Sequence, residues 1–124
     1  MPETSATTNV SPVTSPTVIY TISPTPEPTN TTTATEFFDR AYNKYENGDK
    51  QGAIEDYTQA INLNSNYADA YYNRGLAKYG LGDKQEGIAD FNQAINLNPN
   101  FAKAYYNRGL AKYDLGDKQG AIAD

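Results

Sequence analysis

The side chains that could form ion pairs recur along this chain at a fixed interval of 34 residues. The matching sets are Arg74 with Arg108, Lys78 with Lys112, and Asp56 with Asp90 and Asp124. The planar guanidinium of arginine can hold one carboxylate through two parallel hydrogen bonds. The repeat therefore allows a ladder of arginine and aspartate between stacked units, which would fix their register. Solvated surface charges, each contributing under about 1 kcal/mol, explain the same pattern and stay open as the alternative.

Catalytic chemistry has no obvious carriers in this sequence. Histidine and cysteine are both absent, which removes the commonest general base, the thiolate nucleophile and the soft metal ligands. The carboxylates fall at repeat-equivalent positions and do not converge on one site. The pairs Gly48-Asp49, Gly82-Asp83 and Gly116-Asp117 predict turns followed by helix caps, because no lysine-bearing phosphate motif accompanies them. We predict a non-enzymatic protein without a cofactor or metal.

Composition excludes two further classes of protein. The net charge is −5 and no basic patch is present to neutralise phosphates, so we expect no nucleic-acid partner. No apolar run approaches the roughly 20 residues that a membrane-spanning helix needs. The first residues, MPETSATTNV, have neither the basic region nor the hydrophobic core of a signal peptide.

The interval of 34 residues also predicts the fold. Ala68 to Phe101 forms one full unit, and Ala102 to Asp124 repeats its first part with four substitutions. Apolar residues at helical spacing predict one helix from Asp69 to Leu81 and a second from Lys84 to Leu97. Glycine ends the first helix and Asn98-Pro99 ends the second. A period of this length indicates a solenoid, in which each unit buries its apolar face against its neighbours.

The unit resembles a tetratricopeptide repeat. The residues that carry the resemblance are Tyr71, Gly75, Gly82-Asp83, Phe91, Ala94 and Pro99. The resemblance implies an all-α, right-handed solenoid of antiparallel helix pairs with about two and a half units. Its frame divides the chain into a unit at 34–67, a unit at 68–101 and an incomplete unit at 102–124.

The resemblance also implies a concave groove lined by the first helix of each unit. The residues expected there are Phe38, Tyr42, Tyr45, Tyr72, Asn73, Leu76, Tyr79, Lys103, Tyr106, Asn107, Leu110 and Tyr113. Tyrosine offers rigid amphipathic contacts for a peptide or for sugar rings, although the same rings could instead pack the helices together. Part of the family grips a C-terminal carboxylate with lysine, asparagine and arginine. Only Asn73 and Lys103 fit that clamp, so we do not expect it here.

Residues 1–35 form a Ser/Thr/Pro-rich tail that differs from the repeats. Sixteen of its residues are serine or threonine and six are proline, a composition that cannot bury enough apolar surface to fold alone. We expect an extended, semi-rigid segment. Its one apolar run could dock on a sheet edge or in another subunit's groove. The docking residues are Val18, Ile19, Tyr20 and Ile22.

The tail also holds both asparagine glycosylation sequons of the chain, which begin at Asn9 and Asn30. Dense threonine with proline is typical of an O-glycosylated stalk, and the candidate hydroxyls are Thr29, Thr31, Thr32 and Thr33. Covalent glycans and an extracellular or cell-surface location are the expectation. Chance occurrence of the sequons, an unmodified linker and a cytoplasmic location are the alternatives.

Two functions follow from the repeats. We expect the first unit to begin near Glu36 with Thr35 as its cap, and Lys118 to Asp124 to give only a short last helix. Ends without polar caps favour head-to-tail self-assembly into a fibre or oligomer, because such heterologous contacts do not close. The stacking residues would be Phe37, Phe38, Leu115 and Ile122. The alternative is an adaptor whose tyrosine-lined groove binds a peptide segment of another protein.

Overall fold

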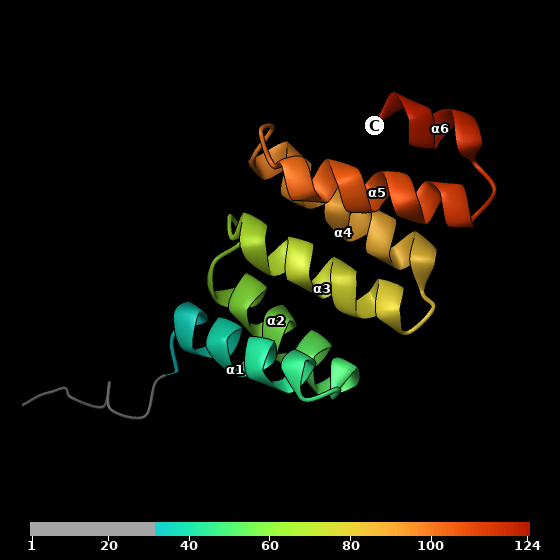
Figure 1. Cartoon of the computed structure of the whole chain (residues 1–124). Helices are drawn as coiled ribbons and strands as arrows, with labels where there is room; N and C mark the ends of the chain where they lie inside the picture. The colour runs from blue at the N-terminus through green and yellow to red at the C-terminus, as the bar shows by residue number, and fades with distance from the viewer. Residues whose placement is uncertain (1–31) are drawn as a thin grey trace, which may run out of the picture. The chain divides into compact units, whose positions relative to one another are not determined.

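The computed structural model describes residues 32–124, which form six α-helices arranged as three antiparallel pairs. The helices are α1 (Ala34–Glu46), α2 (Lys50–Leu63), α3 (Ala68–Gly80), α4 (Lys84–Leu97), α5 (Ala102–Asp114) and α6 (Lys118–Ala123). Each pair packs on the next, so that the units lie in line (Figure 1). The prediction of an all-α solenoid of antiparallel helix pairs is confirmed.

Tight turns join the two helices of each pair. Gly48, Gly82 and Gly116 adopt φ angles of 88°, 93° and 89°, a region in which only glycine avoids steric strain. The aspartate after each glycine precedes the next helix, as the sequence predicts. Asp49 Oδ1 accepts a hydrogen bond of 2.9 Å from the Gly52 N–H.

The side-chain cap is absent in the second unit. Asp117 makes the same bond to the Gly120 N–H, at 2.8 Å, whereas Asp83 makes none. Glu86 stands in the second unit where the other two units have glycine, and its carboxylate lies 3.8 Å from Lys78 Nζ.

The start of α1 differs from the prediction. Thr33, and not Thr35, caps the helix, which therefore begins at Ala34. The Thr33 hydroxyl accepts from the Glu36 N–H at 3.1 Å, and the Glu36 carboxylate accepts from the Thr33 N–H at 2.8 Å. This reciprocal pair satisfies two backbone donors, which a cap at Thr35 could not do because it lacks a partner three residues later. The bounds of α4 agree with the prediction, and α3 begins and ends one residue earlier than predicted.

The core consists of one aromatic side chain from the second helix of each complete unit, surrounded by small residues. Tyr57 of α2 and Phe91 of α4 are 1% and 0% exposed. Tyr57 lies in a buried cluster with Ala41 of α1, and Phe91 lies against Gly75 of α3. In the described part of the chain, α3 contacts both α1 and α5, whereas α2 and α4 do not contact each other. The first helices of the pairs therefore line the inner side of the stack.

Several predicted features lie outside the described residues. They are the docking run Val18, Ile19, Tyr20 and Ile22 and the glycosylation candidates Asn9, Asn30, Thr29 and Thr31. Thr33 is described, and its hydroxyl serves as the helix cap. Among the described helices, none combines the length and the hydropathy that crossing a bilayer requires.

Candidate protein-interaction surfaces

The first helices of the three units present polar and aromatic side chains along the inner side of the stack. We call this surface the first-helix face and define it by Tyr42, Tyr45, Asn73, Leu76, Tyr79 and Lys103, none of which is buried. Tyr42 is 47% exposed. Lysine nitrogens of the second helices lie near two of the rings, with Lys50 Nζ 5.9 Å from the Tyr45 centroid and Lys84 Nζ 6.0 Å from that of Tyr79. The face therefore combines aromatic surface with positive charge at its edge.

Two residues predicted to line the groove instead pack against other aromatic rings at the core. Phe38 stacks on Tyr67, the residue that precedes α3, at 5.0 Å between centroids and meets Tyr57 of α2 edge-on at 5.5 Å. Tyr72 is only 9% exposed and lies against Phe91 and Phe101 at 5.8 and 4.8 Å. A ring with so little exposed surface cannot be a main contact for a ligand.

Hydrogen bonds between consecutive first helices fix the spacing of the units. Asn107 Nδ2 donates to the Tyr72 hydroxyl at 2.8 Å and to the Lys103 carbonyl at 2.9 Å, so this predicted groove residue is occupied within the chain. The Tyr79 hydroxyl donates to the Asp114 carboxylate. This bond to an anion raises the pKa of Tyr79, and burial raises the pKa of Tyr72. Both tyrosines are therefore neutral donors or acceptors near neutral pH.

The repeated arginine and aspartate residues form buried clusters that both interpretations of the sequence missed. Asp90 is only 5% exposed and accepts two hydrogen bonds of 2.8 Å from Nε and Nη2 of Arg74. Lys78 Nζ lies 3.2 Å from the same carboxylate. The pair joins the two helices of one unit, so it is neither an ion-pair ladder between units nor a solvated surface charge.

Units are instead linked by the remaining donor of the arginine. Arg74 Nη1 donates to the Thr58 hydroxyl of the preceding unit at 3.1 Å, and Arg108 donates to Asn92 in the same way at 2.8 Å. Arg108 also pairs with Asp124. Burial raises the pKa of Asp124, but the hydrogen bond and charge of Arg108, helped by Lys112, outweigh it and lower that pKa.

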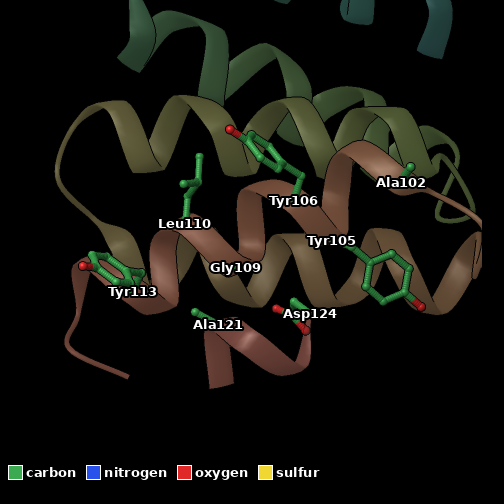
Figure 2. Close-up of a pocket in the computed structure, with 8 residues that line it drawn as sticks. All are labelled: Ala102, Tyr105, Tyr106, Gly109, Leu110, Tyr113, Ala121 and Asp124. Atoms are coloured by element: carbon green, nitrogen blue, oxygen red, sulfur yellow. The ribbon is translucent and has the colours of Figure 1, made fainter. Parts of the chain in front are cut away.

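Three further groove candidates surround a cavity at the end of the stack. The cavity has a volume of about 580 Å³ and lies between α5 and α6 (Figure 2). We call it the terminal slot. Its lining residues are Ala102, Tyr105, Tyr106, Gly109, Leu110, Tyr113, Ala121 and Asp124. Tyr106, Leu110 and Tyr113 are 68%, 40% and 56% exposed, so the sequence predicted their accessibility but not the cavity.

Three family models match most of the described residues. One, described as a TPR repeat, matches residues 41–82, and two described as tetratricopeptide repeats match residues 68–101 and 91–123. The chain belongs to the tetratricopeptide repeat (TPR) family. A comparison with curated proteins found no match.

Solved structures give the same fold. MamA is 33% identical with a TM-score of 0.73, over 74% of this chain and 54% of MamA, so this chain spans about half the length of that relative. The second TPR domain of Spaghetti (RPAP3), bound to the HSP90 peptide SRMEEVD, is 30% identical with a TM-score of 0.72, over 78% of this chain and 90% of that domain. The Arabidopsis OM64 TPR domain is 29% identical with a TM-score of 0.71, over 73% and 74% of the two chains.

The TPR frame also shows that the two ends of the stack differ. Ala70 of α3 and Ala104 of α5 are fully buried against the preceding unit, and Ala111 of α5 is buried there as well. Ala77 of α3 is the counterpart of Ala111. The residues 34 positions before Ala70 and Ala77 are Glu36 and Asn43, which are both exposed on α1. The upstream face of the first unit is therefore polar, a difference that a residue-by-residue comparison of the repeats could have revealed.

The residues predicted to stack at the two ends also differ in exposure. Phe38 packs on Tyr57 and Tyr67 inside the chain, so its ring is not free to form the upstream stacking end that the sequence predicted. Phe37 is half-buried beneath the Arg40 guanidinium, whose carbon lies 4.9 Å from the ring centroid. Leu115 and Ile122 are 45% and 78% exposed near the downstream end. No group of acidic residues in the described part of the chain could hold a metal ion.

Proposed function

We propose that this TPR chain is an interaction module whose first-helix face binds a peptide segment of a partner protein. The observation that carries the proposal is a row of accessible side chains on consecutive first helices, from the exposed Tyr42 of α1 through the half-buried Asn73 of α3 to the exposed Lys103 of α5. Tyrosine rings lose little side-chain entropy when they bind, and their hydroxyls can also hydrogen-bond to a peptide backbone. A row of such side chains suits an extended peptide.

The comparison with Spaghetti (RPAP3) supports this class of ligand. This chain covers 90% of a TPR domain that holds the HSP90 peptide SRMEEVD. At the positions of the carboxylate clamp only Asn73 and Lys103 are retained, while Phe38, Tyr42 and Asn107 replace the other members. Phe38 packs internally and Asn107 bonds to Tyr72. The partner segment therefore differs from a clamped acidic C-terminus and presents apolar or aromatic side chains to Tyr42 and Leu76.

Head-to-tail self-assembly, the other function predicted from the sequence, has weaker support. It would place the exposed Tyr106 and Leu110 of one copy against Glu36 and Asn43 of the next. Burying a carboxylate without a new partner costs several kcal/mol, by order of magnitude. Glycans on the tail and an extracellular location remain predictions from composition alone.

Selection from a displayed random peptide library, followed by measurement of peptide affinity, tests the proposal. We expect Tyr42→Ala and Asn73→Ala each to weaken a selected peptide by about tenfold, which corresponds to about 1.4 kcal/mol. Leu63→Ala is the matched control, because Leu63 is 55% exposed on α2, away from the first-helix face. Tyr72 is not a suitable target, since its buried ring also holds the fold together.

Each result has a definite reading. Equal affinity for the original chain and both face variants would disprove binding at the first-helix face. The same conclusion follows if Leu63→Ala weakens binding as much as Tyr42→Ala does. Circular dichroism of every variant checks that the helical content is unchanged.

A further inference from the structure

The two junctions between consecutive first helices differ at one position. At the second junction the hydroxyl of Tyr79 on α3 donates to the carboxylate of Asp114 on α5. At the first junction the equivalent residues, each 34 positions earlier, are Tyr45 on α1 and Gly80 on α3. Because glycine has no side chain, the carboxylate that accepts the tyrosine hydroxyl at the second junction has no counterpart at the first.

The rest of the arrangement is the same at both junctions. Tyr45 and Tyr79 are each half-buried against the core cluster of their own unit. Lys50 Nζ lies 5.9 Å from the centroid of the Tyr45 ring, and Lys84 Nζ lies 6.0 Å from that of Tyr79. Each junction therefore places one lysine beside one tyrosine, and only the second tyrosine has a carboxylate of the chain as its acceptor.

The side chain of Lys50 lies over the place that a side chain at position 80 would take. A Cβ added to Gly80 would be 2.7 Å from Lys50 Cε and 4.0 Å from Lys50 Nζ. Within residues 32–124 the Lys50 ammonium makes no ion pair and the Tyr45 hydroxyl makes no hydrogen bond. The neighbouring Asp49 does not supply one, since its carboxylate accepts from the Gly52 N–H. Two donors thus flank an accessible position that a carboxylate occupies in the next unit.

We infer that Tyr45 and Lys50 bind a carboxylate of the partner segment at the first junction, in the place that Asp114 takes at the second. The Tyr45 hydroxyl donates to this carboxylate, and the Lys50 ammonium pairs with it. Hydrogen bonds to an ionised acceptor are stronger than those between neutral groups, and partial burial reduces their screening by salt. The ligand group is an aspartate or glutamate side chain, or a terminal carboxylate, about one helical turn along α1 from Tyr42.

The inference rests on the proposed function, because it specifies one group of the segment that binds at the first-helix face. The residues involved differ from the retained members of the carboxylate clamp, which are Asn73 and Lys103. Binding of a carboxylate at Tyr45 and Lys50 can be measured without any peptide. The two proposals can therefore fail separately.

Titration of the isotope-labelled chain with N-acetyl-glutamate methylamide, followed by NMR, tests the inference. The Gly80 amide should shift saturably with this probe and not with N-acetyl-glutamine methylamide, which has nearly the same shape without the charge. N-acetyl-alanine carries only a terminal carboxylate, so its relative affinity shows which kind of carboxylate the site prefers. The Asp114 amide is the internal control and should not shift, because the carboxylate of that residue already occupies the second junction.

Variants of the chain locate the site. Gly80→Asp supplies the missing carboxylate from within the chain, and Lys50→Met removes the charge but keeps the stem. Each should weaken binding of the glutamate probe by about tenfold or more. Gly80→Ala is the matched control, because it adds the same Cβ against the flexible end of Lys50 without an acceptor, and it should retain binding. Asp114→Gly should open a second site, and the Tyr79 amide should then shift as well.

Three results would overturn the inference. The first is an equal response of the Gly80 amide to the glutamate and glutamine probes, or no response to either carboxylate probe. The second is unchanged binding to the Gly80→Asp or Lys50→Met chain. The third is an equal shift of the Gly80 and Asp114 amides, which would show non-specific ion binding.

The same experiments separate this inference from the proposed function. If the glutamate probe binds at Gly80 but no displayed peptide is selected, the carboxylate site is supported and the proposed function fails. If a peptide is selected and replacement of its acidic groups by amides does not weaken it, the inference fails and the proposed function stands.

Discussion

Arg74 and Asp90 face each other across one helix pair and are joined by two hydrogen bonds of 2.8 Å. The aspartate is almost completely buried, and Lys78 adds a second positive charge to it. Because the carboxylate accepts both arginine bonds, the hydrogen bond raises the pKa of Arg74 and the guanidinium stays charged. The ring of Tyr71 covers the guanidinium at 5.5 Å. This cluster links α3 to α4.

Loss of this arginine should destabilise the chain more than loss of its counterpart in the first unit. Arg74→Ala leaves Asp90 buried with Lys78 as its one cationic partner, and we expect a loss of about 2–3 kcal/mol. The side chain of Arg40 is 54% exposed and makes a single bond of 3.3 Å to Asp56. Arg40→Ala should cost under about 1 kcal/mol. Urea unfolding followed by circular dichroism measures both, and equal losses would contradict the assigned difference.

Adding a methyl group at two equivalent glycines should have opposite effects. Gly75→Ala pushes a Cβ to 2.8 Å from the Phe91 ring and 3.1 Å from the Gly87 carbonyl, and we expect a loss of about 1–2 kcal/mol. Gly109→Ala meets its nearest neighbours at 3.5 Å, an ordinary contact. It should gain up to about 1 kcal/mol from helix propensity. The denaturation midpoints of the two variants provide the test, and a shift in the same direction for both would refute the difference in packing.

The helix pairs could be predicted from the sequence, because the 34-residue period and the two apolar stripes within each unit determine them. The partner of each arginine could not. Arg74 has an aspartate 16 residues ahead and another 18 residues behind (74 minus 56), and Arg108 has two candidates at the same separations. Only the packing of α3 on α4 determines that Asp90, and not Asp56, is the partner of Arg74. The exposure of the tyrosines could not be predicted from the sequence either. Tyr72 and Tyr106 occupy the same position in their units, yet they are 9% and 68% exposed.

Buried tyrosines should make the fold sensitive to alkaline pH. Burial is the main cause that raises the pKa of Tyr57 above its ordinary value of 10.0, and it also raises the pKa of Tyr72. A raised pKa in the folded state means that stability is complete below pH 10 and is lost as the pH rises towards the folded pKa. The free energy of unfolding, measured from pH 8 upward, should therefore fall above about pH 10.

Substitution of the buried ring isolates its contribution to this loss. Tyr57→Phe removes the ionisable hydroxyl, so its stability should fall less steeply above pH 10 than that of the original chain. Tyr106→Phe is the matched control, because Tyr106 is 68% exposed and should leave the slope unchanged. Equal slopes for all three proteins would show that ionisation of Tyr57 does not limit alkaline stability.

The polar upstream face should keep the chain from stacking on itself, and removing that polarity should permit stacking. Glu36→Ala with Asn43→Ala reproduces the alanines that are buried at the equivalent positions of α3 and α5. The changed face of one copy could then cover Tyr106 and Leu110 of the next. Since such contacts do not close, we expect the average mass to rise with concentration in sedimentation or light scattering.

Two controls make this result specific to the face. Glu55→Ala with Asn62→Ala removes the same side chains from exposed positions on α2 and should leave the mass unchanged. Adding Leu110→Glu to the changed chain should reverse the association, because it puts a charge on the opposing surface. A different result would contradict the prediction: the average mass of the original chain already rises with concentration, and Leu110→Glu prevents that rise. The polar face would then not prevent stacking, and head-to-tail assembly would be supported as well as peptide binding.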